Sequence, residues 1–399
     1  MINNRIDLTK LKTYAIDDKS AEEVDDSISI EEINGKYRIW IHIVDIDSLV
    51  EYDSAMDKEA YLKASTVYLV EKSINMFPIH ENTQLRGFTS GVNTNSLSTC
   101  IELKDNGEIE SSNIYKSVVK TDYSLSYEEA QELIELAPQE EIDLYLLSQL
   151  MLIRRDYRRN KGAIIIEQAQ GKFVESVESP KIVINEKIEA RIVIEEMMIL
   201  MGEVIANYAT ANEISIIYRI QDISKLPMRS NEIDSEIYES YIKRKLRRAR
   251  LSARPMPHHT LGLRNYCQAT SPIRRYSDLI VHRQIKAHID GMEMLNINEI
   301  REYINTLEVR NNENNQIMNI EQNKCFRNWL VNNDKNIWQI RFIEYLKKNE
   351  SLVNLRFINQ HIDLICSIVN LKEHRLGDYL ELKFLHTSFE EKYLVFQYC

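Results

Sequence analysis

The sequence lacks several features that would each define a class of protein. It contains no run of about 18 apolar residues, which a membrane-spanning helix would need. Its N-terminal segment, Met1–Lys10, is polar and has no apolar centre of the kind found in signal peptides. Internal repeats and low-complexity linkers are also absent. We therefore expect a globular, cytoplasmic protein that does not act at a membrane.

Cysteine is scarce and scattered. The five cysteines lie far apart, and none of them forms a Cys-x-x-Cys pair. This spacing argues against a thiolate zinc site and against a disulfide framework. Reduced thiols, as in the cytoplasm, are the simplest interpretation.

A net positive charge is missing as well. The formal net charge is −11, whereas proteins that bind nucleic acids usually present a basic surface to the phosphates. The exception is Lys243–Arg254, which reads KRKLRRARLSAR and contains seven basic residues and no acidic one. Such a run is often only a solvated helix face. Its position shortly before the motif at Thr270–Asp278 favours a functional role.

The clearest local structure is a hairpin around Asn34-Gly35. Alternating segments flank this dipeptide on both sides, which is a strong hairpin signal. In a two-residue turn, Ile33 faces Lys36, and the pairing runs back to Asp25 opposite Val44. The isoleucines then share the core face, and two aspartates stand at the open end of the hairpin.

Apolar periodicity predicts the remaining elements. Helices are expected at Tyr127–Leu136, Glu141–Asn160, Ile188–Ala211 and Asn298–Asn333. After Asp334 the pattern changes to short segments typical of a small barrel, at Ile337–Tyr345, Leu352–Phe357, Ile362–Val369, Tyr379–Phe384 and Lys392–Tyr398.

An acidic cluster precedes the hairpin. Ile16–Asp26 reads IDDKSAEEVDD, with six carboxylates in eleven residues. A solvated loop would explain these acids in many proteins. Here the last two adjoin an apolar sheet, where buried charge is costly without a counter-ion. Oxygen-only ligands favour Mg²⁺ or Mn²⁺ over zinc.

The same segment resembles the signature of the RNase II/RNase R (RNB) family, in which I-D is followed by a short spacer, an acid, one residue and D-D. Further similar motifs follow in the family's order over about residues 5–290. They lie at His42–Asp45, Ser54–Ala60, Ser65–Leu69, Met76–Pro78, Ala190–Ile199, Tyr218–Asp222 and His258–Ala287.

The resemblance implies an α+β fold. Residues 1–333 would form an RNB catalytic domain, with a mixed β-sheet core surrounded by helices, and residues 334–399 a degenerate OB-like RNA-binding barrel. Few basic residues and no obvious aromatic platform occur in the barrel segment. We expect the family's N-terminal cold-shock domains to be absent, and substrate anchoring to be weaker than in longer relatives.

By position, the family's metal-binding acids correspond to Asp17, Glu23, Asp25 and Asp26. Asp25 is the one expected to matter most for catalysis. Glu23 departs from the aspartate of the best-known members. Its extra methylene would shift the metal and lower the rate, or it would mark a subgroup.

The motif at Thr270–Asp278 reads TSPIRRYSD. Ser271 and the proline after it read as the N-cap and first residue of a helix that runs to about Ile289. Arg274 would then lie in the first turn, where free amides and its guanidinium suit a phosphate. The alternative is an i,i+4 ion pair with Asp278. In the family, the matching arginine contacts the scissile phosphate, and Arg275 beside it is a further candidate RNA contact.

Four other residues are candidate RNA contacts. Tyr68 matches a family tyrosine that sets how the last nucleotides sit. Glu196 could accept a hydrogen bond from a ribose 2′-hydroxyl, and Glu195 is an equal candidate by spacing. His258 lies within the motif, although for this residue and for His42 a structural role is the simpler interpretation.

The family resemblance implies a magnesium-dependent 3′→5′ exoribonuclease that releases nucleoside 5′-monophosphates from single-stranded RNA, and we expect it to act as a monomer. One alternative is a catalytically weakened or inactive RNB-fold protein that binds RNA or regulates. A second is an acidic scaffold with chance motifs, which would have no affinity for RNA.

Overall fold

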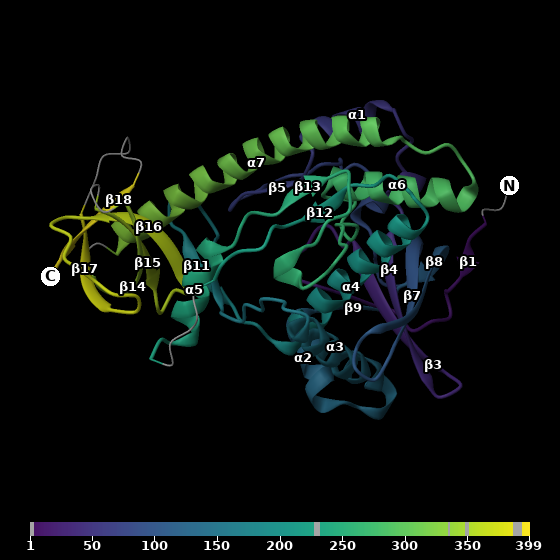
Figure 1. Cartoon of the computed structure of the whole chain (residues 1–399), viewed down its shortest axis with the longest axis horizontal. Coiled ribbons are helices and arrows are strands. Elements are labelled where there is room, and N and C mark those ends of the chain that lie inside the picture. The colour runs from purple at the N-terminus through teal and green to yellow at the C-terminus, as the bar shows by residue number, and fades with distance from the viewer. Residues whose placement is uncertain (1–3, 227–231, 334–335, 348–350, 386–392) are drawn as a thin grey trace.

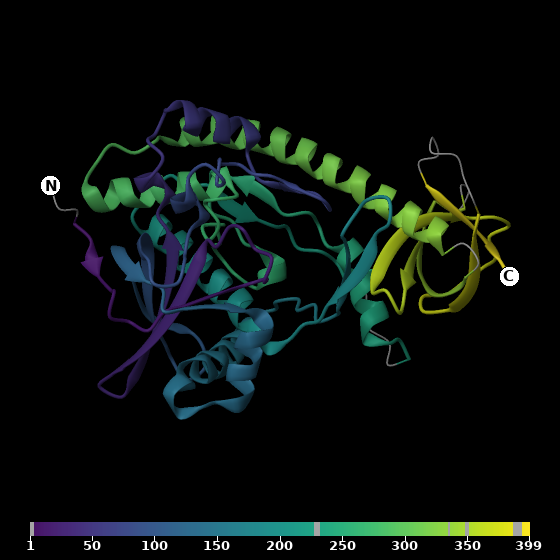
Figure 2. The ribbon, with the colours of Figure 1, turned by 180° about the vertical axis from the view of Figure 1, so that it is seen from behind.

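The chain folds into a large body of sheet and helices and a small barrel at the opposite end from the N-terminus (Figure 1). The computed structural model describes residues 4–226, 232–333, 336–347, 351–385 and 393–399. Figure 2 shows the same two parts from behind. No helix within these ranges is both long and apolar enough to cross a membrane.

A seven-stranded sheet forms the centre of the large body, with strand order β1-β8-β7-β4-β3-β2-β9. Most neighbours are antiparallel, but β1 pairs with β8 and β2 with β9 in parallel. The strands are β1 (Ile6–Asp7), β2 (Tyr14–Asp17), β3 (Asp26–Ile33), β4 (Lys36–Val44), β7 (Asn93–Leu103), β8 (Ile109–Lys120) and β9 (Tyr123–Ser126).

The hairpin of β3 and β4 confirms the predicted register. Ile33 pairs with Lys36, and the Val44 N–H donates to the Asp25 carbonyl at 3.0 Å. Asn34 and Gly35 have φ angles of 53° and 76°, as a two-residue type I′ turn requires. The isoleucines of both strands are buried in the main core, so the two aspartates are held at a fixed end of the sheet.

Helices surround the sheet, and α2, α3 and α4 contact both the sheet and one another. The helices are α1 (Ala55–Lys63), α2 (Tyr127–Leu136), α3 (Ile142–Asn160), α4 (Glu189–Ala211), α5 (Ser235–Lys245), α6 (Tyr276–Asp290) and α7 (Ile297–Asn332). The four helices predicted from periodicity are confirmed to within one or two residues at each end.

Helix α6 begins later than the sequence predicted, and Ser271 is not its N-cap. The residues from Ser271 form a turn, in which the Arg275 N–H donates to the Ser271 carbonyl at 2.9 Å. Arg275 is extended and pairs with Ser65. The Arg274 carbonyl accepts a hydrogen bond from the Thr66 N–H. Because this pairing requires extended backbone, the helix starts only at Tyr276. Arg274 therefore precedes the helix.

The C-terminal strands close into a five-stranded barrel of order β14-β15-β16-β18-β17. They are β14 (Ile337–Lys347), β15 (Leu352–Phe357), β16 (Ile362–Ile368), β17 (Tyr379–Leu385) and β18 (Leu394–Tyr398). All five were predicted, although the expected start of the last, Lys392, lies outside the described residues. The α+β class, with an RNB-like body and an OB-like barrel, is confirmed.

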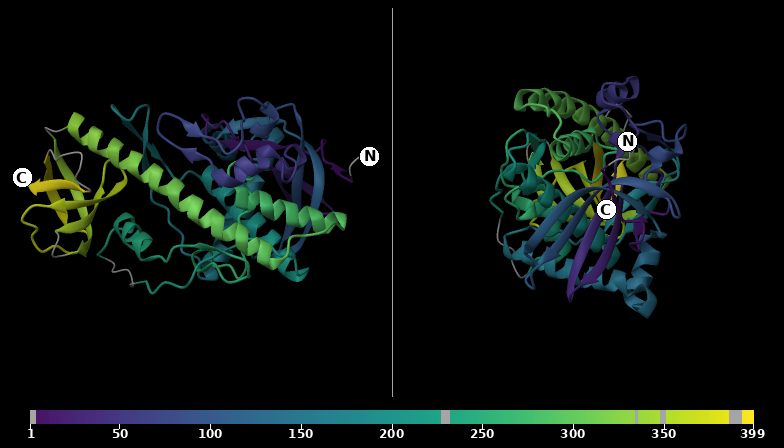
Figure 3. Two further views of the ribbon diagram at one scale, coloured as in Figure 1. Left: turned by 90° about the horizontal axis from the view of Figure 1, so that it is seen from above. Right: turned by 90° about the vertical axis from the view of Figure 1, so that its right-hand side faces the viewer.

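The barrel is connected to the body by α7, by the hairpin of β10 (Gln170–Val174) and β11 (Lys181–Asn185), and by α5, which packs against β14. Helix α7 buries Ile300 and Leu307 in the main core and Phe326 and Leu330 in the barrel core, and it spans the distance between them in the left view of Figure 3. The hairpin of β10 and β11 contacts α7 and β16. The barrel core thus includes residues from before 334, and the division at 333/334, which adjoins undescribed residues, stays a prediction.

Three short strand pairs complete the structure. Besides β10 and β11 they are β5 (Val67–Tyr68) with β6 (Ser73–Ile74), and β12 (Tyr218–Ile220) with β13 (Arg250–Ser252).

Candidate functional site

Asp25 is a buried carboxyl group, and Asp26 beside it is half-buried. Asp25 is 3% exposed, and its Oδ1 accepts a hydrogen bond of 2.8 Å from the Ile273 N–H. The Oδ2 atoms of both aspartates are buried without a hydrogen-bond partner. Burial raises the pKa of Asp25 to about 7. Burial and repulsion from Asp17 and Asp25 raise the pKa of Asp26 to about 8.

Arg274 points at these carboxylates. Its Nε lies 3.4 Å from Asp25 Oδ2, and its side chain is 40% exposed. The neighbouring Arg275 instead forms the ion pair with Asp278, at 2.7 Å. The alternative in which Arg274 pairs with Asp278 is therefore wrong. Of the two adjacent arginines, Arg274 therefore points toward the acids, and Arg275 binds Asp278 of α6.

Glu23 is surrounded by hydrogen-bond donors. Its carboxylate accepts from the Tyr68 hydroxyl at 2.6 Å, from Asn75 Nδ2 at 2.8 Å and from Thr66 Oγ1 at 3.2 Å. Glu23 and Tyr68 were both predicted as site residues, but the contact between them was not, and Asn75 was not predicted at all. No local pattern marks this asparagine, because its role depends on a partner 52 positions away.

One pocket joins these residues. It has a volume of about 600 Å³. Asp17, Glu23, Tyr68 and Arg274 all line it, together with residues of β10 and α7. Asp25 and Asp26 do not line the pocket themselves, but their charges interact with those of the lining residues Asp17, Glu23 and Arg274. The pocket is also lined by residues that were not predicted as site residues: Asp18, Ser20, Ala21, Glu22, Leu69, Val70, Ser73, Asn75, Lys172, Phe173, Val174 and Gln322.

The donor set suits a hard divalent cation, although the acids do not form a finished ligand shell. Within the described part of the chain, no three His, Cys, Asp or Glu side chains stand close enough together to hold an ion as they are placed. The chemistry nevertheless fits: all the candidate donors are carboxylate oxygens, and two of them, Oδ2 of Asp25 and Oδ2 of Asp26, are buried without a hydrogen-bond partner. The carboxylates would have to close further around an ion.

The other predicted RNA contacts lie outside this pocket. Glu196 is 1% exposed, and both its oxygens accept from Arg158, at 2.8 and 2.5 Å. Glu195 pairs with Lys187. His258 is 8% exposed, its ring packs edge-on against a tyrosine, and burial lowers its pKa to about 4. The structure therefore gives the two glutamates ion-pair partners within the protein.

His42 has a structural environment. Its ring lies between the hydroxyls of Ser29, at 3.2 Å, and Ser98, at 2.7 Å. Burial lowers the pKa of His42 to about 3, so the ring is neutral at physiological pH. It serves to join adjacent strands of the sheet.

Four of the seven cations in the basic run Lys243–Arg254 form ion pairs, with two carboxylates between them. Arg244 and Lys245 both bind Glu344 of the barrel. Arg247 and Arg250 lie 3.6 Å from Asp222. These pairs connect α5 and β13 to their neighbours, but the run as a whole keeps a net positive charge.

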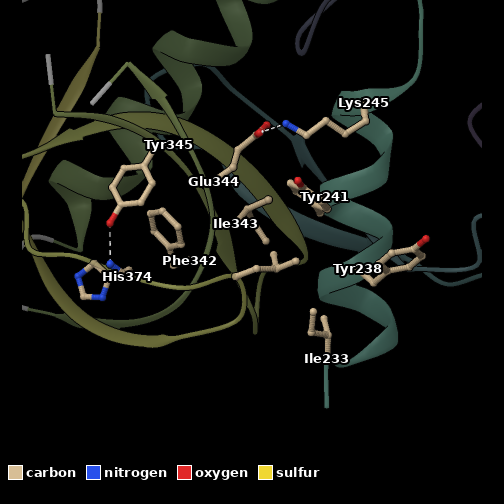
Figure 4. A pocket seen from close by; sticks show the side chains of 10 residues that line it. Ile233, Tyr238, Tyr241, Lys245, Phe342, Ile343, Glu344, Tyr345 and His374 are labelled. Carbon is tan, nitrogen blue, oxygen red and sulfur yellow. Dashed lines mark hydrogen bonds and ion pairs between the residues drawn. The ribbon is translucent and has the colours of Figure 1, made fainter. Parts of the chain in front are cut away.

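A second pocket, of about 480 Å³, lies between α5 and the barrel (Figure 4). Tyr241, Tyr345 and His374 are among the rings that line it. Its acid is Glu344, which Lys245 and Arg244 already bind. This pocket shares no residue with the carboxylate pocket and has no acidic cluster that could hold a catalytic metal.

The barrel carries an exposed aromatic ring that was not among the predicted RNA contacts. Tyr379 is 73% exposed, and the Arg341 guanidinium lies 3.9 Å from its ring centroid. The two residues are cross-strand partners of β14 and β17. This stacking depends on strand register rather than on composition, and the expectation that the barrel has no aromatic platform for RNA stays a prediction.

Comparison with known proteins gives matches over most of the chain. Residues 5–291 match the model of the RNB domain. An uncharacterized ribonuclease of Synechocystis sp. is 32% identical over 354 residues, which cover 87% of this chain and 53% of that protein. The chloroplastic/mitochondrial ribonuclease II of Arabidopsis thaliana is 36% identical over 299 residues, which cover 72% of this chain and 37% of that protein. The chain thus spans about half or less of the length of these relatives.

Solved structures share the fold at low sequence identity. Mycoplasma genitalium RNase R in complex with ribose-methylated single-stranded RNA superposes with a TM-score of 0.87 and 20% identity, over 99% of this chain and 72% of that one. Yeast Ssd1, a pseudonuclease, superposes with a TM-score of 0.72 and 18% identity, over 91% of this chain and 50% of that one. The same architecture therefore occurs in a nuclease and in a pseudonuclease.

Proposed function

Because this chain belongs to the RNB domain family, we propose that it is a 3′→5′ exoribonuclease that hydrolyses single-stranded RNA to nucleoside 5′-monophosphates. The observation that carries the proposal is the pocket shared by Asp17, Glu23, Tyr68 and Arg274, with Asp25 against the arginine. It combines ligands for a cation with a guanidinium that can bind a phosphate.

Asp17, Glu23, Asp25 and Asp26 would hold Mg²⁺ or Mn²⁺. When bound, the cation lowers the pKa of a water molecule and offsets charge on phosphate oxygens. Among the described residues, Asp26 Oδ2 has no donor, and Asp25 Oδ2 faces only the Arg274 guanidinium at 3.4 Å. Both atoms support this assignment, because buried carboxylate oxygens are costly unless cations neutralise them. Asp25 is the ligand that also touches Arg274, so it links the cation to the phosphate-binding group.

Arg274 would hold the scissile phosphate and stabilise the negative charge that develops on it. Its partly exposed side chain and its position over the acids support this role. Tyr68 would position the last nucleotides: its ring is 44% exposed, while its hydroxyl is fixed by Glu23. Arg275, His258, Glu195 and Glu196 remain proposed RNA contacts, with weaker structural support because the first and the last two have ion-pair partners within the protein.

A digestion assay run beside a binding assay tests the proposal. A 5′-labelled single-stranded RNA should shorten from its 3′ end in Mg²⁺ and should release mononucleotides. Asp25→Asn should abolish cleavage while RNA affinity is largely kept. Failure of the wild-type protein to cleave in either Mg²⁺ or Mn²⁺ would overturn the enzymatic assignment.

The competing function is a catalytically weakened RNA-binding protein. Its specific support is Glu23, whose carboxylate already accepts three hydrogen bonds and is less free to bind a metal. This candidate predicts RNA affinity that is independent of divalent cations, with no shortening of the RNA. The same pair of assays distinguishes the two.

We also propose that the protein acts as a monomer in the cytoplasm. Its described cysteines are free, and four of the five are buried, which suits a reducing compartment. Size-exclusion chromatography with light scattering tests the monomer, and imaging of a tagged chain tests the compartment.

A further inference from the structure

Lys172 is a cation on the wall of the carboxylate pocket that the reaction proposed above does not use. It lies on β10, whereas the acids come from the segment between β2 and β3 and Arg274 from the turn before α6. The pocket is therefore completed by a hairpin that is distant in sequence from the catalytic motifs.

The hairpin holds Lys172 at this position. Its neighbour Phe173 is 3% exposed and packs in the barrel core, with its ring centroid 5.5 Å from that of Phe326. Both residues line the carboxylate pocket, but Phe173 is buried and Lys172 is exposed. The cross-strand partner of Lys172 is Val183. The backbone beside it is thus anchored while its ammonium is free to meet a ligand.

Lys172 differs from Arg274 in that, within the described part of the chain, no acid lies against its ammonium group. Four acids line the pocket, and Arg274, the other cation that lines it, already lies against Asp25. Lys172 has no ion pair or hydrogen-bond partner among the residues that the structure describes. A polyanionic substrate that enters an acid-rich pocket needs positive charge from the protein, and Lys172 offers it.

We propose that Lys172 binds a backbone phosphate near the 3′ end of single-stranded RNA. An ammonium group on a flexible stem is a point charge that suits a phosphate oxygen and does not read a base. Arg274 and Lys172 would then hold two phosphates of one strand from different walls of the pocket. Lys172 is a positioning residue, and its assignment rests on the proposed function.

The hairpin supplies a matched control in Lys181. This residue lies on β11 of the same hairpin, does not line the pocket, and forms an ion pair of 2.8 Å with Glu175. Lys172→Met and Lys181→Met remove the same charge from the same exposed hairpin. A general loss of positive charge would affect both variants alike, whereas loss of a phosphate contact affects only the first.

The experiment measures the affinity of each protein for a short labelled single-stranded RNA, in EDTA to prevent hydrolysis, over a series of salt concentrations. Lys172→Met should bind roughly three- to tenfold more weakly at low salt. The slope of log affinity against log salt should fall in magnitude by about 0.7, as expected for one lost phosphate contact. Lys172→Arg should keep affinity and slope, and Lys181→Met should match the wild type.

Three results would overturn the proposal or its basis. An unchanged slope in Lys172→Met would show that this side chain meets no phosphate. Equal losses in Lys172→Met and Lys181→Met would show a general charge effect. A wild-type protein that binds no RNA would overturn both the role of Lys172 and the proposed function. A wild-type protein that binds RNA but does not cleave it would overturn only the proposed function, and the salt slopes would still decide the role of Lys172.

Discussion

Asp25→Asn tests in one change whether the carboxylate cluster is built for a cation. Burial raises the pKa of Asp25 from its ordinary 3.8 to about 7. A carboxyl whose pKa is higher in the folded than in the unfolded state binds more protons when folded, so stability falls as the pH rises between these two values. A shift of about three units corresponds to roughly 4 kcal/mol as an upper estimate.

Without divalent cations, we therefore expect Asp25→Asn to be more stable than the wild type at pH 7.5, by about 1–4 kcal/mol. The amide keeps an oxygen that can accept from the Ile273 N–H. The two proteins should converge below about pH 3.8, where the wild-type carboxyl becomes protonated in both states. Urea unfolding in EDTA across this pH range measures the difference.

Adding Mg²⁺ should remove most of this difference, or reverse it where the difference is smaller than the stabilisation by the cation. A cation that binds only the folded state stabilises the wild type by about 2.7 kcal/mol at one hundred times its Kd, and it should stabilise Asp25→Asn much less. Asp105→Asn, in the exposed turn between β7 and β8, is the control and should behave as the wild type throughout. If Asp25→Asn is instead destabilised equally at every pH, Arg274 already neutralises Asp25, and the argument for a cation fails.

Three further changes probe the rest of the site. Arg274→Lys keeps the charge but loses the guanidinium fork, so single-turnover cleavage should fall more than RNA affinity; equal rates would make Arg274 structural. Glu23→Asp shortens the side chain and should release the Tyr68 hydroxyl. We expect the free energy of unfolding to fall by about 1 kcal/mol and the length of the smallest undigested RNA to change. An unchanged end product would show that the hydrogen bond from Tyr68 to Glu23 does not set this length. Glu196→Gln should cost roughly 3–5 kcal/mol in urea unfolding by leaving Arg158 buried without its counter-ion; a stable variant with a lost preference for RNA over DNA would restore Glu196 as a ribose contact.

Local periodicity predicted much of the fold. The Asn34-Gly35 turn and the alternation around it determined the register of β3 and β4, because a one-residue slip would expose the isoleucines. Apolar spacing located α2, α3, α4, α7 and the barrel strands. The long strands β7 and β8 were not predicted. β7 buries serines at positions 96 and 98. The Ser98 hydroxyl bonds to His42 and Ser117 on the neighbouring strands, and the Ser96 hydroxyl donates to the Thr94 carbonyl of its own strand. Such small polar residues carry no strand signal.

Contacts between distant segments were harder to predict. The sequence suggested that Arg274 would face the acids only because the motifs resemble a family, since Asp25 lies 249 positions earlier. The start of α6 was misplaced because strand pairing with Ser65, invisible in the motif itself, keeps Arg275 extended. The role of Asn75 and the position of Lys172 also required three-dimensional neighbours.

The energetics of the acids bear on whether this RNB protein is a nuclease or, like yeast Ssd1, a pseudonuclease. Among the residues that the structure describes, the Oδ2 atoms of Asp25 and Asp26 are buried without a hydrogen-bond partner, and only that of Asp25 has an ion-pair partner, Arg274; their burial reduces the stability of the metal-free fold. Asparagine at these positions would keep the shape of the site at lower cost, so a protein that only binds RNA gains nothing from the two charges. Glu23 points the other way, because three donors satisfy it without a cation. Stability measured with and without Mg²⁺ therefore informs the assignment independently of any cleavage assay, since only a cation-binding site converts the cost of Asp25 and Asp26 into a gain.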